Sequence, residues 1–372
     1  MATTKTSARL EASLDERFMA RAVRMAHKGL GSTYPNPSVG AVVVRGSEVI
    51  GAAHSDPTGG PHAEVKALRQ AGAAAKGATL YVTLEPCCHH GRTGPCTGAI
   101  LESGVARVVI GLRDPARHAD GKGIRRLRRG GLVVTEGVLQ GACAEVHAHY
   151  VHHVQTGRPF VSLKIACSID GRIATPQGDS KWITGERARR HTHELRARHH
   201  AIAVGVGTVL ADDPRLDVRL VRGHDPLRVV FDTRLRIARA RPRPVVVREG
   251  TIVVHGPDAS PRARTTLEKQ GVELVEVAAA PGGRIDVTAA LDALGGREIR
   301  SLLVEGGGLL HGAFVTAAVW ERLHVFQAPK LLGEGRPMVA GVDWPRVADA
   351  PVLRVVSRKR LGDDLLTVYA RQ

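Results

Sequence analysis

Four side chains in the first hundred residues have the types and spacing of a hydrolytic metal centre. His62 and Glu64 lie two residues apart directly after Pro61, and Cys87 and Cys96 follow a run of strand-forming residues. A catalytic zinc ion takes three protein ligands and leaves one position for water, whose pKa it lowers towards about 7. We therefore expect His62, Cys87 and Cys96 to bind Zn2+, and Glu64 to carry protons between the water and a leaving group.

The same residues fit the signature of zinc deaminases, His-x-Glu followed by Pro-Cys-x-x-Cys, with one departure. Eight residues separate Cys87 from Cys96 in place of the usual two. The alternative is a structural zinc site, but such a site needs four protein ligands and has no use for an acid at Glu64. Cys88 is a second candidate ligand, although the signature favours the cysteine that follows Pro86. The pattern predicts a deaminase and leaves its substrate open.

The net charge of the chain raises a different function, nucleic-acid binding. The formal charge is +17, from 53 Lys and Arg against 36 Asp and Glu. The arginines are scattered along the chain and aromatic residues make up only 3%, so surfaces on which bases stack would be sparse. We expect no nucleic-acid partner and attribute part of the charge to attraction of a phosphorylated substrate. A nucleic-acid deaminase and a binding protein with an inert zinc module remain the alternatives.

The elements that position these residues follow an alternating α/β pattern. In the first half the pattern indicates helices at 15–28, 62–70 and 97–103 and strands at 39–44, 79–84 and 106–112. The pattern pauses at Gly157 and Pro159 and then resumes. The second series has helices at 185–200, 261–270 and 309–318 and strands at 160–166, 201–206, 228–231, 251–254 and 301–304, with a strand-to-loop turn at 205–210. The 372 residues therefore suit two α/β domains, 1–153 and 158–372.

Several other features limit where and with what the protein acts. No run of apolar residues approaches the length of about 18 that a membrane span requires, and the polar N-terminus does not resemble a secretion signal. Three of the five cysteines lie within ten residues, which suits metal binding in a reducing compartment. We expect a cytoplasmic protein with no membrane partner. The histidine groups at 147–153 and 191–200 lack accompanying acids or thiols and are interpreted as surface or hinge histidines.

Two segments around the metal centre closely resemble one family, the bifunctional deaminase/reductases of riboflavin biosynthesis. They are Asn-Pro-Ser-Val-Gly at 36–40 and Thr-Leu-Glu-Pro-Cys-Cys-His-His-Gly-Arg-Thr at 83–93. The family has a long insertion before the last zinc cysteine, which matches the eight-residue gap; its usual Pro-Pro-Cys reads Gly94-Pro95-Cys96 here. Matches to its reductase domain lie at 164–172, 182–184, 208–214, 304–308 and 328–333. The resemblance extends from about residue 15 to 369.

The resemblance implies a fold and a pair of reactions. It implies an N-terminal three-layer domain similar to cytidine deaminase and a C-terminal domain similar to dihydrofolate reductase. The first half would deaminate 2,5-diamino-6-ribosylamino-4(3H)-pyrimidinone 5′-phosphate. The second half would use NADPH to reduce the ribosyl group to ribityl. A homo-oligomer is also expected, and a paralogue that uses the same intermediates in a secondary pathway remains an alternative.

The resemblance also places the family's contacts on particular residues. The cofactor contacts fall on Ala166, Trp182, Thr208, Asp212, Gly307, Gly308 and Leu309. The substrate contacts of the reductase half fall on Ser180, Arg196, Leu216, Arg219 and Glu305. Both arginines can bind a phosphate with paired donors, and Glu305 can bind sugar hydroxyls. In the deaminase half, Asn36, His90 and Arg92 are the candidates for holding the substrate.

Overall fold

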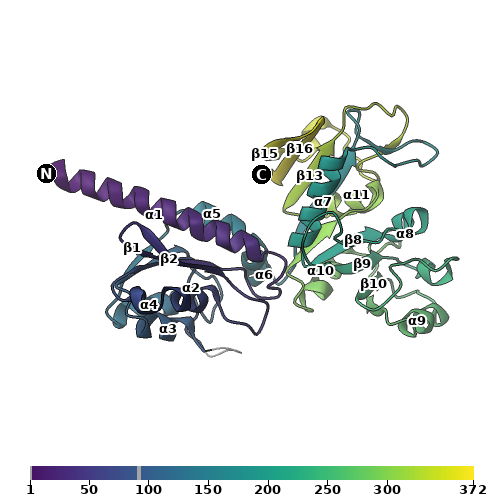
Figure 1. Cartoon of the computed structure of the whole chain (residues 1–372). Helices are drawn as coiled ribbons and strands as arrows, with labels where there is room; N and C mark the ends of the chain where they lie inside the picture. Colours follow the sequence, from purple (N-terminus) through teal and green to yellow (C-terminus); the bar gives the residue numbers. More distant parts are fainter. Residues whose placement is uncertain (1, 90–93) are drawn as a thin grey trace. The chain divides into compact units, whose positions relative to one another are not determined.

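The computed structural model describes residues 2–89 and 94–372. Its contacts divide the chain into two compact units, Met1–Thr156 and Gly157–Gln372, each with its own sheet (Figure 1). No helix in the described part of the chain is both long enough and apolar enough to cross a membrane.

The first unit is built on a five-stranded sheet with the order β2-β1-β3-β4-β5. β1 is antiparallel to β2 and β3, whereas β3, β4 and β5 are parallel. The strands are β1 Gly40–Arg45, β2 Glu48–His54, β3 Thr79–Leu84, β4 Arg107–Leu112 and β5 Val133–Glu136. The helices are α1 Ala2–Gly29, α2 Ala63–Ala71, α3 Cys96–Glu102, α4 Lys122–Arg129, α5 Gln140–Val146 and α6 Ala148–Thr156.

Alternation along β1 explains why this sheet carries helices on both faces. Ala41 and Val43 belong to a buried cluster that includes side chains of α2, α3 and α4. Val42 and Val44 belong to a second cluster, with side chains of α1 and α5. Successive side chains of a strand point to opposite faces, so a strand with apolar residues at every position needs a cover on each side. The result is a helix-sheet-helix arrangement of three layers.

The second unit is built on a nine-stranded sheet with the order β11-β10-β9-β8-β12-β6-β13-β16-β15. The strands from β11 to β13 are parallel, and β16 and β15 are antiparallel additions at one edge. The parallel strands are β6 Phe160–Cys167, β8 Ala201–Gly205, β9 Leu227–Phe231, β10 Thr251–His255, β11 Glu273–Glu276, β12 Ser301–Val304 and β13 Arg322–Gln327. β15 spans Leu353–Leu361 and β16 spans Asp364–Arg371, while the short strands β7 Arg172–Ala174 and β14 Arg336–Pro337 form a separate pair.

Helices cover both faces of the parallel part of this sheet. α10 Val287–Gly295 and α11 Gly308–Thr316 pack on one face with Leu163, Val229 and Leu302. On the other face, Val204 and Val230 pack with α8 Val206–Asp212 and α9 Pro261–Glu268, and α7 Glu186–Arg198 packs beside them with Leu303 and Phe326. Because the strands are parallel, the loops that follow their carboxyl ends meet at one edge, where α/β sheets bind ligands.

Two sequence expectations about this architecture are wrong. The segment at 205–210 is not a turn into a loop, because α8 begins at Val206. The histidines of the two unaccompanied groups are not all at the surface, since His147, His193 and His199 are buried. Each of these three rings has a polar partner: His147 contacts Thr83 Oγ1, His193 contacts the Arg219 amide and His199 contacts Ser162 Oγ.

Candidate active sites

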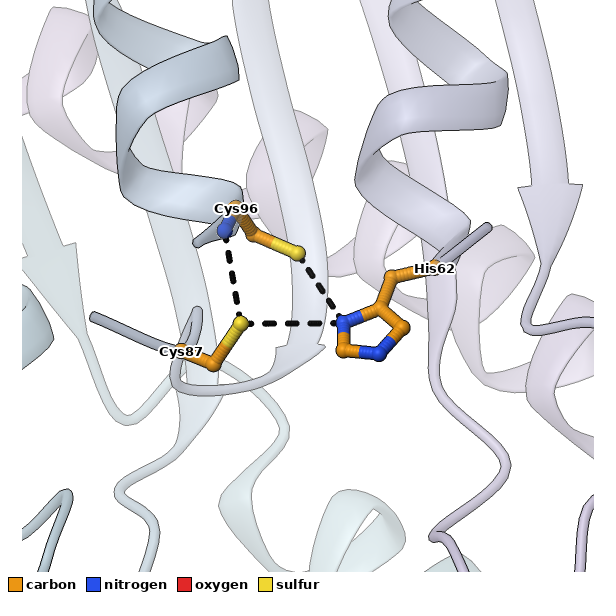
Figure 2. Close-up of side chains that lie close together, drawn as sticks. All are labelled: His62, Cys87 and Cys96. Carbon is orange, nitrogen blue, oxygen red and sulfur yellow. Dashed lines mark hydrogen bonds between the residues drawn. The ribbon is translucent and has the colours of Figure 1, made fainter. Parts of the chain in front are cut away.

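The metal centre is assembled from two helix starts and one strand end. His62 is the residue before α2, Cys96 is the first residue of α3, and Cys87 follows the end of β3 by three residues. The His62 Nδ1 atom lies 3.1 Å from Cys96 Sγ and 3.6 Å from Cys87 Sγ (Figure 2). The Cys96 amide also donates to Cys87 Sγ at 3.3 Å. The three ligand atoms all lie within 4.8 Å of one another, which the spacing in the sequence predicted.

The donor set fits zinc with a position left for water. One imidazole nitrogen and two thiolate sulfurs are ligands that zinc prefers, and three protein ligands are the number found in catalytic sites. The group contains Cys87 and not Cys88, in line with the preference of the signature for the cysteine after Pro86. Glu64, in the first turn of α2, is only 3% exposed, and its Oε2 atom has no hydrogen-bond partner among the described residues. A buried carboxylate oxygen without a partner suits an acid whose partner is a substrate or water.

Hydrogen bonds and burial shift the pKa values of both cysteines and of the acid in this centre. Hydrogen bonds from Cys96 and His62 lower the pKa of Cys87 to about 4. The hydrogen bond to Cys87, together with burial, raises the pKa of Cys96. Burial and the negative charge of Cys87 raise the pKa of Glu64 to about 6. A carboxyl group with a pKa near neutrality can both accept and return a proton.

The candidate substrate residues of the first unit are only partly described. Asn36 has an exposed side chain in the loop before β1, and its carbonyl accepts a hydrogen bond from Thr33 Oγ1 at 3.1 Å. Thr58 Oγ1 donates to the Thr33 carbonyl at 3.0 Å and so ties this loop to the segment that precedes His62. His90 and Arg92 lie outside the described residues. The described residues therefore offer a substrate one exposed side-chain amide, that of Asn36, on a loop that hydrogen bonds hold in place.

In the second unit, two of the expected substrate residues form a buried ion pair. Arg196 on α7 donates from Nε and Nη2 to the two carboxylate oxygens of Glu305, at 2.7 and 3.0 Å. Glu305 directly follows β12, and Lys164 on the neighbouring β6 places its Nζ atom 3.8 Å from Glu305 Oε2. Burial opposes ionisation of Glu305, but the charges of Arg196 and Lys164 lower its pKa to about 2.

Arg219 lies in a second group that contacts the first. Its Nη1 atom donates to Asp217 Oδ1 at 2.5 Å, and the Asp217 carbonyl accepts from Arg196 Nη1 at 3.1 Å. His193 accepts the Arg219 amide at 3.2 Å; burial and the neighbouring arginines lower its pKa to about 4, which keeps this ring neutral. Leu216, an expected substrate contact, is only 2% exposed and belongs to a core cluster, so it offers a ligand almost no surface.

Sequence reasoning missed three residues of this cluster: Lys164, His193 and Asp217. Lys164 begins a segment that carried the family resemblance, but its partner Glu305 is distant in the sequence and adjacent only through the pairing of β6 with β12. His193 is three residues before Arg196 on α7, a spacing that places both on one helix face and could have signalled the connection.

The expected cofactor residues gather at the carboxyl edge of the same sheet. A Cβ atom on Gly307 would lie 4.0 Å from Thr208 Oγ1, so the loop after β12 faces the start of α8. Asp212 at the end of α8 lies 4.0 Å from Lys181 Nζ, the residue before Trp182. Trp182 and Leu309 are exposed, Ala166 is near the end of β6, and Ser180 is in the loop before Trp182. Gly307 directly precedes α11, which begins at Gly308, and the open space at Gly307 leaves the main chain of this helix start accessible to a pyrophosphate.

Comparisons with known proteins match each unit of the chain to a protein family. Residues 12–112 match the cytidine and deoxycytidylate deaminase zinc-binding region, and residues 159–367 match the RibD C-terminal domain. The riboflavin biosynthesis protein RibD of Actinobacillus pleuropneumoniae is 38% identical over 357 residues, which cover 95% of each chain.

Two solved structures are similar over nearly the whole length. Acinetobacter baumannii RibD is 34% identical, with a TM-score of 0.88 over 97% of this chain and 99% of that one. The diaminohydroxyphosphoribosylaminopyrimidine deaminase/5-amino-6-(5-phosphoribosylamino)uracil reductase of Thermotoga maritima is 36% identical, with a TM-score of 0.85 over 97% and 100% of the two chains.

The fold, the metal centre and these matches define a class: a cytidine-deaminase-like zinc enzyme joined to a reductase domain. A zinc-binding deaminase region together with a reductase domain implies zinc and a nicotinamide cofactor. Within that class, the chain belongs to the RibD family of riboflavin biosynthesis. The family and the α/β fold predicted from the sequence are confirmed.

Proposed function

We propose that the chain catalyses two consecutive reactions on one phosphorylated pyrimidine. The first unit deaminates 2,5-diamino-6-ribosylamino-4(3H)-pyrimidinone 5′-phosphate, and the second reduces the ribosyl group of the product to ribityl with NADPH. The observation that carries the proposal is the group of three zinc-type ligand atoms beside the buried acid Glu64, in a chain whose other half is a RibD reductase domain. The similar protein of Thermotoga maritima is named for the same pair of activities, a deaminase and a reductase.

The residues of the first unit have distinct roles in this proposal. His62, Cys87 and Cys96 would hold the zinc ion, which would supply Lewis acidity to the water molecule that is needed for deamination. Glu64 accepts a proton from that water and returns it to the departing amine; its unpartnered, buried oxygen supports this role. Asn36 holds the pyrimidine through its exposed amide, and the loop containing His90 and Arg92 binds the phosphate.

The buried cluster of the second unit binds the sugar phosphate. Arg196 holds Glu305 ionised, so that the carboxylate accepts hydrogen bonds from sugar hydroxyls. The side chain of Arg219 is 45% exposed and keeps donors for the phosphate, with Arg196 contributing charge from the same cluster. Ser180 and Leu216 are the remaining proposed substrate contacts.

NADPH supplies the hydride for the sugar carbon, and the exposed edge of the sheet provides its binding surface. Ala166, Trp182, Thr208, Asp212, Gly307, Gly308 and Leu309 are the proposed contacts, and their gathering at one edge supports this assignment. The cytoplasmic location, the homo-oligomeric state and the absence of a nucleic-acid partner stay predictions from the sequence.

The assay that tests the proposal supplies the diaminopyrimidinone nucleotide with and without reduced cofactor. We expect ammonia release without any cofactor, and oxidation of NADPH only when that release can occur. NADH in place of NADPH, and the nucleoside without its phosphate, are the comparison reactions; both are expected to give a higher KM. Ammonia release from a nucleic acid but none from the free nucleotide would contradict the proposal.

A further inference from the structure

Two segments that carried the family resemblance are hydrogen-bonded to each other at the carboxyl edge of the second sheet. They lie outside the buried cluster of Arg196 and Glu305. One is the turn at 168–171, after β6, and the other is the segment at 329–333, after β13. The Ile169 amide donates to the Lys330 carbonyl at 2.8 Å. Asp170 accepts from the amides of Leu332 and Gly333, at 3.2 and 2.7 Å. Because β6 and β13 are parallel neighbours, these bonds fasten two loops that leave the same edge of the sheet.

Lys330 extends from this junction to the loop that carries Trp182. Its Nζ atom donates to the Trp182 carbonyl at 2.6 Å. Trp182 is 60% exposed, so burial contributes little to holding it. The other contacts of this loop are also polar or stacked: the Arg189 guanidinium lies 4.7 Å from the centre of the indole ring, and Lys181 is 4.0 Å from Asp212.

The turn at 168–171 is also connected, through the segment at 338–340, to Gly308 at the start of α11. The Met338 amide donates to the Gly171 carbonyl at 3.0 Å, and the Ala340 amide donates to the Gly308 carbonyl at 3.0 Å. One hydrogen-bonded path therefore connects Asp170 and Lys330 with the helix start at which the cofactor pyrophosphate is proposed to bind. Lys181 and Trp182 are both exposed, and an exposed part of a loop moves at little free-energy cost, so a single charged donor can decide its position.

We propose that Lys330 is a positioning residue of the reductase unit, and that it holds the Trp182 loop in the orientation that binds the nicotinamide cofactor. Asp170 fixes the segment from which Lys330 extends. This inference rests on the proposed cofactor contact of Trp182. Lys330 acts through the Trp182 main chain and has no part in the transfer of hydride itself.

The test is the dissociation constant of NADPH, measured by calorimetry on the full chain. Removing the donor with Lys330→Met is expected to raise this constant about five- to tenfold, the equivalent of one hydrogen bond of ordinary net strength. Lys330→Arg keeps a charged donor and is expected to stay within about twofold of the original value. Lys269→Met, which removes an exposed lysine just after α9, is the matched control and should leave the constant unchanged.

A spectroscopic measurement separates positioning from general loss of structure. In a Trp344→Phe background, Trp182 is the exposed indole, since Trp320 is 1% exposed. Lys330→Met should increase quenching of this emission by acrylamide, while ammonia release by the first unit stays unchanged.

Two outcomes would overturn the inference. Only the second would also contradict the proposed cofactor contact of Trp182. If Trp182→Leu raises the NADPH constant but Lys330→Met changes neither the constant nor the quenching, Lys330 does not position the loop and the proposed cofactor contact stands. If Trp182→Leu leaves the constant unchanged, the cofactor contact fails and the positioning role fails with it.

Discussion

Glu64 is the residue on which the chemistry of the first unit depends most. Its carboxyl group is buried beside the three zinc-type ligands, and burial together with the Cys87 charge raises its pKa to about 6. Such a group is ionised at neutral pH and is still basic enough to take a proton from water. It contributes no ligand atom to the group of His62, Cys87 and Cys96.

Replacing Glu64 should therefore separate catalysis from metal binding. In Glu64→Gln the amide cannot accept the proton, and ammonia release is expected to fall by about 10²- to 10⁴-fold. Zinc content, measured by atomic emission, should remain that of the original chain. Glu48→Gln, an exposed acid on β2, is the control and should release ammonia at the original rate. Loss of zinc from the Glu64→Gln chain would assign Glu64 to metal binding instead.

The sequence predicted the metal centre more fully than the reductase cluster, for a physical reason. The residues of the metal centre lie at two helix starts and after one strand end, namely His62, Glu64, Cys87 and Cys96. Local sequence patterns indicate where helices start and strands end, so they locate these residues. The pairing of Lys164 with Glu305 depends on which strands become neighbours in the sheet, and no local pattern records that. The burial of Leu216 likewise depends on how the core of the second unit packs, which the local sequence does not record.

At the scale of elements, α11 shows how closely the second unit packs around its proposed cofactor site. Gly308 and Gly312 face the segment at 337–340, and a Cβ atom on Gly312 would lie 1.9 Å from the Ala340 carbonyl oxygen. The main chain of that segment therefore approaches the helix at a distance that only glycine permits. In the first unit, by contrast, a Cβ atom on Gly141 of α5 would meet nothing within 4 Å.

We expect replacement by alanine to have opposite effects on stability at Gly312 and Gly141. Gly312→Ala should destabilise the second unit by about 1–3 kcal/mol, because the added methyl group displaces the 337–340 segment. Gly141→Ala should be neutral or stabilising by up to about 1 kcal/mol, since alanine favours a helix. Thermal denaturation of both variants measures the difference. An unchanged midpoint in Gly312→Ala would show that the segment moves away at no cost.

The boundaries of elements followed the sequence pattern only where the pattern was strong. The strand expected at 79–84 coincides with β3, whose apolar run ends at Glu85. The helix expected at 15–28 begins at Ala2, because no breaker precedes residue 15 in the chain. The start of α8 was missed because two glycines, Gly205 and Gly207, resemble a turn when their tertiary surroundings are unknown.

At the scale of the whole molecule, the chain joins two units that each have a sheet, a core and a candidate site. The buried clusters around β1 and β3 belong to the first unit, and those around β6, β8 and β12 belong to the second. Removing the metal ion should therefore affect the first reaction and leave the second site intact. The length of 372 residues and the pause near Gly157 indicated this division, whereas the identity of each half required the motifs.

The measurement that tests the central claim most directly is NADPH oxidation by zinc-stripped chain, offered the diaminopyrimidinone nucleotide and, separately, its deaminated product. We predict oxidation at the original rate with the deaminated nucleotide, none with the diaminopyrimidinone nucleotide, and recovery of the latter when zinc is restored. Equal oxidation of NADPH with both nucleotides in the zinc-free chain would contradict the account, because the second site would then not depend on the product of the first.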